Sequence, residues 1–315
     1  MSAVVCLSGG VGGAKLLLGL QRILPAGELT AIINTGDDFD HLGLRICPDI
    51  DTALYTLAGL ANPELGWGRR DETWTFMQTL EQLGGETWFR LGDGDLALHI
   101  ERTRRLGDGQ LLDSITRVIA ATLGIATTVV PMTNDAVRTR VMTDLGELDF
   151  QHYFVRLRCE PALQSCRFVG AETATITSAA SAALTQSPRA IVIAPSNPYL
   201  SIDPILALPG MRELLRASGA PVIAVTPLIG GNAVKGPTAK IMRELKREIS
   251  PLAIAEHYRG LVDGFVLDEC DSALAAQLAI PCAITNTLMR SLADRERVAD
   301  VALEFADSLR ARGAR

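Results

Sequence analysis

The sequence has no surplus of positive charge and no long apolar run, and each absence excludes a class of protein. Its 30 Lys and Arg residues against 36 Asp and Glu give a net charge of −6, which argues against a general nucleic-acid-binding surface. No apolar run approaches the roughly 18 residues of a membrane span, and the first residues lack the basic region of a secretory signal. We therefore expect a cytoplasmic protein that binds neither nucleic acid nor membrane.

Several motifs of metal binding and covalent catalysis are also missing. The six cysteines are scattered without a C-x-x-C pair, so buried thiols are expected rather than a thiolate metal site. The four histidines are dispersed and form no i, i+4 pair. No G-x-S-x-G sequence provides a nucleophile elbow. If the protein is an enzyme, direct transfer without a covalent enzyme intermediate is the simpler mechanism.

A glycine-rich stretch near the start is the most informative feature that is present. Residues 3–7 are typical of a buried strand and residues 16–20 of a helix. The glycines between them let the backbone approach a ligand closely, and the N-terminus of the following helix favours an anion. We interpret Gly10, Gly12 and Gly13 as parts of a phosphate- or diphosphate-binding loop. A tight turn without a ligand is the alternative.

This loop matches neither standard nucleotide-binding motif. A dinucleotide fingerprint requires a third glycine where the chain has Lys15, and a Walker loop requires a hydroxyl residue where it has Leu16. A Rossmann-type dehydrogenase would need that third glycine, together with an acidic residue such as Asp37 after the second strand. The sequence therefore predicts a phosphate site outside both standard classes.

The rest of the chain alternates short apolar strands with helical segments. Strand-like runs follow at 29–33, 127–130, 190–193, 222–225, 264–267 and 282–285, and 137–143 with 148–155 is typical of a β-hairpin. This order predicts an α/β fold with a doubly wound, Rossmann-like, mostly parallel sheet. We expect residues 1–61 and 124–315 to form this core. Residues 62–123 are expected to form a smaller, mostly helical insertion that covers the active-site crevice.

Aspartates lie directly after the second predicted strand and again in the stretch 47–52. In a parallel α/β sheet, loops at the carboxyl ends of strands line the ligand crevice, so four aspartates are expected to converge there: Asp37, Asp38, Asp49 and Asp51. Clustered carboxylates repel one another unless a cation joins them, and oxygen ligands suit Mg²⁺. We therefore predict Mg²⁺ as the cofactor, with Asp37 and Asp49 as its ligands. Helix capping is the alternative role for either residue.

Two later loops carry groups that suit phosphate. Ser196 and Asn197 lie in a turn fixed by prolines, and residues 230–237 form a second glycine-rich loop with one lysine. The residues expected to contact a diphosphate or nucleotide are Gly10, Gly12, Gly13, Ser196, Asn197, Gly230, Gly231, Asn232 and Lys235. Each loop could also be a purely structural turn. Arg90 could face either an anion or an aromatic ring.

With these motifs the sequence resembles the 2-phospho-L-lactate transferase family of coenzyme F-420 biosynthesis. The matching stretches are 8–15, 34–38, 48–52, 66–68, 71–74, 91–93, 195–198 and 230–237, in the order of the family. The resemblance implies transfer of a phospholactyl-type group from a guanosine diphosphate-linked donor to the deazaflavin Fo, with release of GMP and a requirement for Mg²⁺. It leaves lactyl, enolpyruvyl and glyceryl donors open.

The resemblance also implies that the aspartate of the P-D-I-D-T motif and the basic residue of the x-L-G-D motif bind Fo, and these are Asp51 and Arg90. We expect a ribityl hydroxyl of Fo to attack the β-phosphorus, with Asp51 as the catalytic base and Asp37 as a second catalytic aspartate. A nucleotide-binding regulator of the same fold is an alternative. A homodimer is expected as the commonest assembly.

Overall fold

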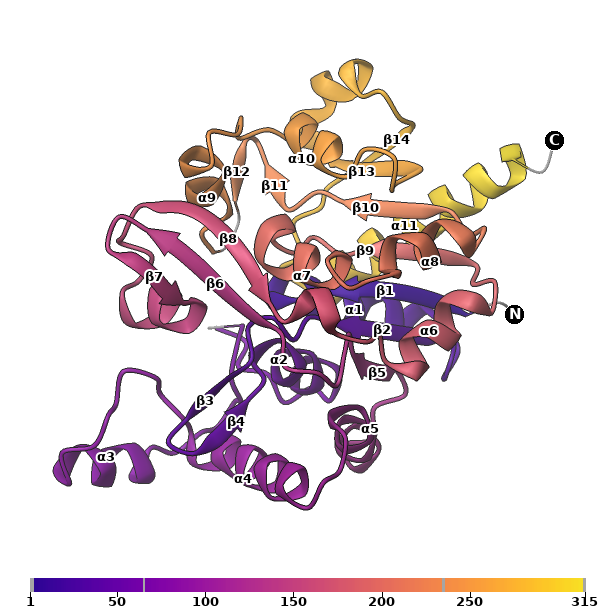
Figure 1. Ribbon diagram of the computed structural model, residues 1–315. Coiled ribbons are helices and arrows are strands. Elements are labelled where there is room, and N and C mark those ends of the chain that lie inside the picture. The colour runs from indigo at the N-terminus through magenta and orange to yellow at the C-terminus, as the bar shows by residue number, and fades with distance from the viewer. Residues whose placement is uncertain (1–2, 65, 234–235, 314–315) are drawn as a thin grey trace.

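The computed structural model describes residues 3–64, 66–233 and 236–313 (Figure 1). Its main strands are β1 (Val4–Ser8), β2 (Leu29–Ile33), β5 (Thr128–Pro131), β9 (Ala190–Ile193), β10 (Val222–Val225), β13 (Gly264–Asp268) and β14 (Cys282–Thr285). Among the described residues these form one seven-stranded sheet in the order β14–β13–β10–β9–β1–β2–β5. Each neighbouring pair is parallel. The predicted α/β, doubly wound sheet is therefore confirmed.

Strand β1 illustrates how the sheet is buried on both faces. Val4 and Cys6 belong to one hydrophobic cluster, whereas Val5 and Leu7 belong to another, because successive side chains point to opposite faces. Helices α1 (Gly10–Ile23), α2 (Pro48–Leu57), α5 (Leu112–Thr122) and α11 (Leu292–Gly313) contribute to the first cluster; α6 (Ser178–Thr185), α8 (Met211–Ala217), α9 (Thr238–Glu244) and α10 (Pro251–His257) contribute to the second. Such doubly covered strands are apolar throughout, which makes them detectable in the sequence.

The strand order sets the position of the ligand crevice. From β1 the chain first builds β2 and β5 on one side, and then returns to add β9, β10, β13 and β14 on the other. The switch point lies between β1 and β9, which pair directly. In open α/β sheets, ligands bind at this point, beyond the carboxyl ends of the strands. The segments that follow β1 and β9 therefore meet at the predicted crevice.

The segment between β2 and β5 contains two short strands and four helices among its described residues. Its elements are β3 (Phe39–His41), β4 (Leu44–Ile46), α2, α3 (Thr75–Gln82), α4 (Asp93–Gly107) and α5. Figure 1 shows α3 and α4 beside β3 and β4, at one side of the sheet. A small cluster of Ile46, Met77 and Leu91 lies there. Helix α5 instead packs against the sheet, since Leu112 and Ala120 share a hydrophobic cluster with strand residues.

The predicted hairpin is part of a three-stranded antiparallel sheet. Strands β6 (Arg138–Thr143) and β7 (Gly146–Asp149) pair as expected, and β8 (Leu163–Val169) pairs with the other edge of β6. The second strand was predicted to continue to residue 155, but residues 152–156 form a helical turn. Phe150 and Tyr153 are both buried, and their three-residue spacing suits a helix rather than a strand. The other short elements are α7 (Asp203–Leu206), β11 (Leu228–Ile229) and β12 (Asn232–Ala233).

The first helix begins before the predicted residues 16–20, and the loop expected to carry Asp49 and Asp51 is the start of a helix. Helix α1 begins at Gly10, and α2 begins at Pro48. The predicted glycine loop is therefore short, with Gly12 and Gly13 in the first turn of α1. Asp49 and Asp51 likewise lie in the first turn of α2 rather than in a loop. Proline suits the first position of a helix, and carboxylates suit its N-terminal turn, so the motif itself begins the helix.

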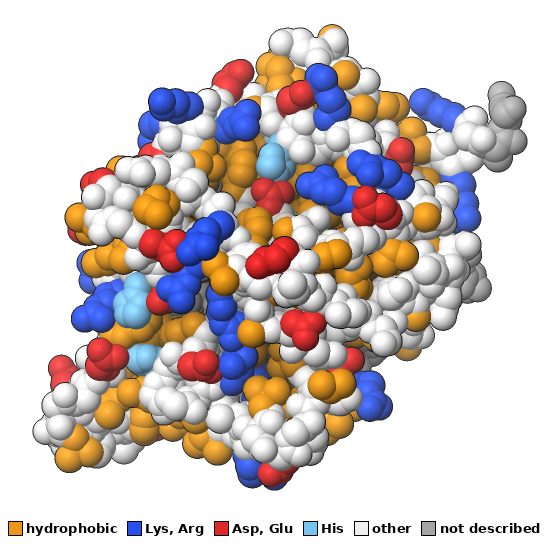
Figure 2. Space-filling view, in the orientation of Figure 1, with side chains coloured by type: hydrophobic (Ala, Val, Ile, Leu, Met, Phe, Trp, Pro, Cys, Tyr) orange, Lys and Arg blue, Asp and Glu red, His pale blue; other side chains and the backbone are white. Residues whose placement is uncertain are grey.

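No helix in the described part of the chain combines the length and the apolar character that a bilayer crossing requires. Basic and acidic side chains are interspersed on the face of the molecule that Figure 2 shows. Charges of opposite sign therefore neutralise one another locally across that face.

Candidate active site

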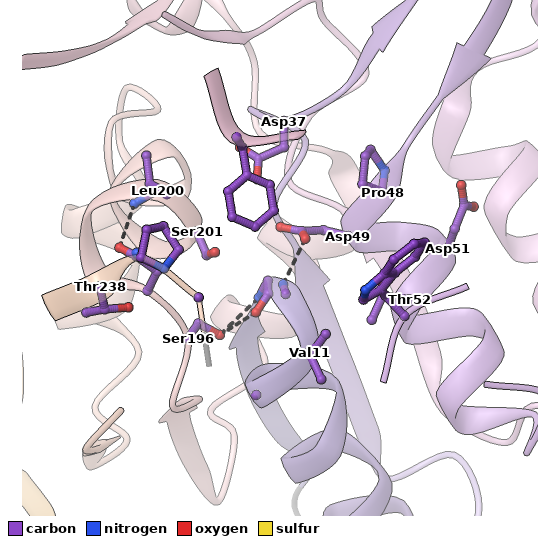
Figure 3. A pocket seen from close by; sticks show the side chains of 18 of the residues that line it. Val11, Asp37, Pro48, Asp49, Asp51, Thr52, Ser196, Leu200, Ser201 and Thr238 are labelled. Atoms are coloured by element: carbon purple, nitrogen blue, oxygen red, sulfur yellow. Dashed lines mark hydrogen bonds between the residues drawn. The ribbon is translucent and has the colours of Figure 1, made fainter. Parts of the chain in front are cut away.

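A cavity of about 710 Å³ lies beyond the carboxyl ends of the central strands, at the switch point of the sheet. It brings together predicted residues from segments far apart in the chain: Gly10, Gly12, Asp37, Asp49, Asp51, Arg90, Ser196 and Asn197. Figure 3 shows one part of this cavity, with the first turn of α2 facing the loop that follows β9. The topology therefore assembles most of the predicted site in a single place.

The glycines of α1 allow a close approach between the segments after β1 and β9. Gly9 donates its N–H to Ser196 Oγ at 3.1 Å, and Ser196 Oγ donates to the Gly9 carbonyl at 2.7 Å. A side chain at Gly12 would place its Cβ 2.5 Å from the Pro195 carbonyl oxygen, and one at Gly13 would place it 2.3 Å from Ser8 Oγ. Gly13 packs internally and is not among the described residues that line the cavity. Close packing is the role that the structure contains for Gly13, and its ligand contact stays a prediction.

The side chain of Asp49, from α2, contacts the N-terminus of α1. Its two carboxylate oxygens accept hydrogen bonds from the Gly10 N–H at 2.8 Å and from Asn34 Nδ2 at 2.9 Å (Figure 3). Gly10 has a φ of +64°, a left-handed conformation that glycine adopts without strain. The Gly10 N–H therefore binds Asp49, and the next N–H groups of the first helical turn have no partner within the helix itself.

Asp37 and Asp49 form a buried carboxylate pair that has no ion-pair partner among the described residues. Burial raises the pKa of Asp49 to about 6. Burial and the neighbouring Asp49 together raise the pKa of Asp37 well above its usual range, although Asn34 and Thr139 donate hydrogen bonds that oppose the rise. Two adjacent carboxylates that resist ionisation are a donor set that fits a hard cation such as Mg²⁺.

The described residues contain no cluster of three or more His, Cys, Asp and Glu side chains arranged to hold a metal ion. A cation beside Asp37 and Asp49 would therefore take its other ligands from water and from the oxygens of a bound substrate. Mg²⁺ is commonly bound in this way, through one or two carboxylates together with substrate phosphates.

Asp51 lies in a different environment from Asp49, although only one residue separates them. Its Oδ2 accepts a hydrogen bond from Arg102 Nη1 at 3.1 Å, and its Oδ1 accepts one from Arg102 Nη2. Arg102 is 1% exposed and comes from α4. Asp51 still borders the cavity, but both its oxygens are engaged by a cation.

Arg102 was missed by the sequence analysis. It stands three residues after His99, on the stripe of α4 that both residues bury, where an apolar residue would be the ordinary occupant. A basic residue on the apolar stripe of an insertion helix was the available signal. The identity of its partner could not be found from the sequence, because 51 residues separate Arg102 from Asp51.

A polar chain extends from Asp51 along one wall of the cavity. His99 Nδ1 lies 3.6 Å from Asp51 Oδ2, and His99 Nε2 lies 3.2 Å from Asp95 Oδ2. Tyr55 donates its hydroxyl to Asp95 Oδ1 at 2.5 Å. Tyr55, Asp95 and His99 all line the cavity, and the sequence analysis assigned a role to none of them.

An aromatic wall adjoins this polar chain. Its members are Trp67, Trp88, Phe89, Phe150 and Phe154, which come from two segments far apart in sequence. Arg90 borders the cavity, and its guanidinium carbon lies 4.2 Å from the centre of the Trp74 ring. Of the two roles left open for Arg90, the structure contains the contact with an aromatic ring. An exposed guanidinium beside aromatic rings suits a planar or anionic ligand.

Asn197 presents a hydrogen-bond donor at the opposite wall. Its Oδ1 accepts from the N–H groups of Tyr199 and Leu200 at 3.0 and 3.2 Å. That capping role fixes the amide, and its Nδ2 is buried without a partner among the described residues. A buried donor without a partner costs free energy unless a ligand satisfies it, so Asn197 fits a phosphate contact.

The second glycine-rich loop borders the cavity through Gly236 and Pro237, at its end, and not through its first residues. Gly230 and Gly231 form the turn between β11 and β12, with φ of +57° and +70°. Gly230 donates its N–H to Asp271 at 2.9 Å, and Asn232 donates to the Gly230 carbonyl at 3.0 Å. None of these three is among the described residues that line the cavity, and Lys235 lies outside the described residues. Here glycine serves a hairpin turn.

The fold and the site together define a Rossmann-like α/β protein whose switch-point cavity combines an anion-binding helix terminus, a carboxylate pair and an aromatic wall. The model of the family 2-phospho-L-lactate transferase CofD matches residues 4–300. The chain belongs to this family, as the motifs predicted. It is a transferase of coenzyme F-420 biosynthesis, and the dehydrogenase and regulator alternatives are set aside.

Curated relatives match along nearly the whole chain. The phosphoenolpyruvate transferase of Streptomyces griseus is 39% identical, covering 98% of this chain and 99% of that protein. The phosphoenolpyruvate transferase of Mycobacterium ulcerans is 40% identical, covering 85% of this chain and 88% of that protein. A crystal structure of a UPF0052 family member from Bacillus halodurans superposes with a TM-score of 0.65 at 17% identity, covering 96% of this chain and 100% of that one. This last similarity concerns the fold alone.

Proposed function

We propose that this protein transfers a phosphoenolpyruvyl group from a guanosine diphosphate-linked donor to Fo and releases GMP. The observation that carries the proposal is the single cavity that joins the N-terminus of α1, the Asp37–Asp49 pair and the Asp51–Arg90 wall. The relatives named phosphoenolpyruvate transferase support the enolpyruvyl donor over the lactyl and glyceryl donors.

The donor diphosphate would lie between α1 and the loop after β9. Gly10 and Gly12 border this part of the cavity together with Ser196 and Asn197. The first turn of α1 offers N–H groups and the positive end of the helix dipole. Asn197 would donate its unpartnered amide to a phosphate oxygen. These groups position the β-phosphorus, which is the main requirement for phosphoryl-type transfer.

Asp37 and Asp49 would hold Mg²⁺, which when bound neutralises charge on the diphosphate. Asp49 is held by two hydrogen bonds within the protein and therefore suits a fixed ligand. Asp37 is held by side-chain hydrogen bonds from Asn34 and Thr139, and the one from Thr139 to its Oδ1 is long, at 3.4 Å. Its carboxylate is therefore freer to exchange partners during the reaction.

We assign the proton-accepting role to Asp37 rather than to Asp51. A ribityl hydroxyl of Fo forms a bond to the β-phosphorus, the bond from that phosphorus to the bridging oxygen breaks, and GMP leaves with the electron pair. The hydroxyl proton passes to Asp37, which borders the cavity and has no ion-pair partner among the described residues. Both oxygens of Asp51 already accept hydrogen bonds from Arg102, so we assign this carboxylate to binding and not to proton transfer.

The acceptor would occupy the other half of the cavity. Asp51 and Arg90 flank it, and the aromatic wall offers rings against which a deazaflavin can stack. We propose that residues 62–123 cover this half, since Trp67, Trp88 and Arg90 come from them, while residues 1–61 and 124–315 form the core. The homodimer stays a prediction.

The decisive experiment incubates the protein with Fo, Mg²⁺ and each of the three donors separately, and analyses the products by mass spectrometry. We expect GMP and an enolpyruvyl-phosphate adduct of Fo, and loss of both products when EDTA removes the metal. Adduct formation only with the lactyl or glyceryl donor would overturn the donor assignment. Absence of any adduct with all three donors would overturn the proposed function.

A further inference from the structure

Arg102 is a fully buried cation that does not itself border the cavity. It lies on α4 and engages Asp51, on α2, through both terminal nitrogens. Its Nη1 also lies 3.4 Å from the Arg45 carbonyl oxygen and 3.3 Å from His99 Nδ1. Arg102 therefore connects a helix of the segment 62–123 to the helix that carries the substrate-facing aspartates.

A buried ion pair is an inefficient way to stabilise a fold. The desolvation of two charges offsets most of their attraction, and well-packed apolar residues often stabilise as much or more. The geometry of the Arg102–Asp51 pair is bidentate, which restricts the orientation of the carboxylate more strongly than a single hydrogen bond would. The main contribution of the pair is therefore to fix the orientation of the Asp51 carboxylate.

The pair leaves Asp51 able to bind a further partner. A carboxylate has about four lone-pair sites, and the guanidinium uses two of them. The side chain of Asp51 is 7% exposed and borders the cavity. His99 and the Tyr55–Asp95 hydrogen bond flank it along the same wall. Hydroxyl groups are the partners that such a row of fixed acceptors would bind.

We infer that Arg102 is a positioning residue that holds Asp51 as a fixed anionic acceptor for the hydroxyl groups of the acceptor substrate. In this arrangement Asp51 binds the polyol chain and does not take the reacting proton. The inference rests on the proposed function, because it assumes that Fo is the molecule bound at this wall. Arg102 acts on binding of the acceptor and leaves the donor site unchanged.

The test compares variants at the pair with a matched control on the same helix. Arg102→Met removes the cation, and Arg102→Lys keeps the charge but loses the planar, bidentate geometry. Arg104→Met is the control, because Arg104 is exposed and its ion pairs are with Glu101 on α4 and with Asp108 directly after that helix. For each variant we would measure kcat, the KM for Fo and, by calorimetry, the Kd for GDP.

We expect Arg102→Met to raise the KM for Fo about tenfold or more, as loss of an oriented charged hydrogen-bond partner does. Arg102→Lys should recover part of this loss, and the Kd for GDP should stay unchanged in both variants. Arg104→Met should match the wild-type protein. An unchanged KM for Fo in Arg102→Met, or a parallel loss of GDP and Fo binding, would overturn the inference.

A double variant separates positioning from stability. Asp51→Asn with Arg102→Met removes both charges, so it should melt at a higher temperature than Arg102→Met alone while its KM for Fo stays raised. Recovery of Fo binding together with stability would mean that the pair acts only through the fold. If the wild-type protein forms no Fo adduct, the proposed function fails; if it does, these variants judge the inference by itself.

Discussion

Asp49 and Asp51 occupy the same helical turn, yet they serve opposite walls of one cavity. Residues two apart on an α-helix point about 200° away from each other. Asp49 therefore turns toward the N-terminus of α1, whereas Asp51 turns toward Arg102 of α4. Figure 3 shows the two carboxylates pointing away from each other. Asp49 lies beside another carboxylate and has no ion-pair partner in the described part of the chain, whereas Asp51 lies against a buried arginine. The comparison teaches that the surroundings, not the residue type, decide what a carboxylate can do.

The largest effect is expected from Asp37→Asn, compared with Asp51→Asn. Removing the proton acceptor should lower kcat by about two to four orders of magnitude, with GDP binding still measurable. Asp51→Asn should chiefly raise the KM for Fo. Steady-state kinetics with both substrates varied separates the two effects. A greater loss of kcat in Asp51→Asn than in Asp37→Asn would show that Asp51, and not Asp37, is the proton acceptor.

The next effect concerns stability at the two walls. Asp51→Asn leaves Arg102 buried without its partner and should lower the free energy of unfolding by about 3–5 kcal/mol. Asp49→Asn removes a buried charge whose ionisation costs stability at this pH, so it should leave that free energy unchanged or raise it by up to about 3 kcal/mol. Chemical denaturation of both variants at pH 7 without Mg²⁺ provides the comparison. Equal destabilisation would break the contrast between the walls.

A smaller effect is expected from pH and Mg²⁺ on the wild-type protein. Burial raises the pKa of Asp49 from 3.8 to about 6, so ionisation of this group costs the metal-free folded state up to about 3 kcal/mol. The unfolded chain loses its proton first, so stability falls as pH rises from about 4 to 6, and the cost persists above that range.

Mg²⁺ should relieve this cost, because it favours the ionised carboxylates. The increase in melting temperature on addition of Mg²⁺ should therefore be larger at pH 7.5 than at pH 5. Asp49→Asn is the control, in which the dependence of this increase on pH should weaken. If Mg²⁺ raised the melting temperature equally at both pH values, Asp49 would not be a ligand of the cation.

The smallest effect is expected at the aromatic side of the acceptor wall. Arg90→Lys keeps a positive charge but loses the planar group that lies over Trp74. We expect a rise in the KM for Fo of about two- to fivefold, which corresponds to an exposed cation–π contact. The kcat and the Kd for GDP should not change. A rise in the Kd for GDP would show that Arg90 contacts the donor instead of the acceptor.

The two glycine-rich loops show how far motif reasoning extends. Both have the composition of a phosphate loop, but only the first follows the strand at the switch point. Gly12 is required there because the Pro195 carbonyl lies close to it. Gly230 and Gly231 adopt positive φ in a hairpin turn instead. Composition alone does not distinguish these uses, since glycine favours a close approach and a tight turn equally.

The sequence by itself determined the parallel sheet, the family and three of the aspartates that border the cavity. These follow from local patterns, namely apolar strands buried on both faces and polar residues just beyond their ends. Only the tertiary structure decided the partners of those aspartates, including Arg102 for Asp51 and Gly10 for Asp49. These contacts depend on which side of its helix each aspartate faces and on how distant segments of the chain pack together. The chemistry of a carboxylate depends in turn on such neighbours.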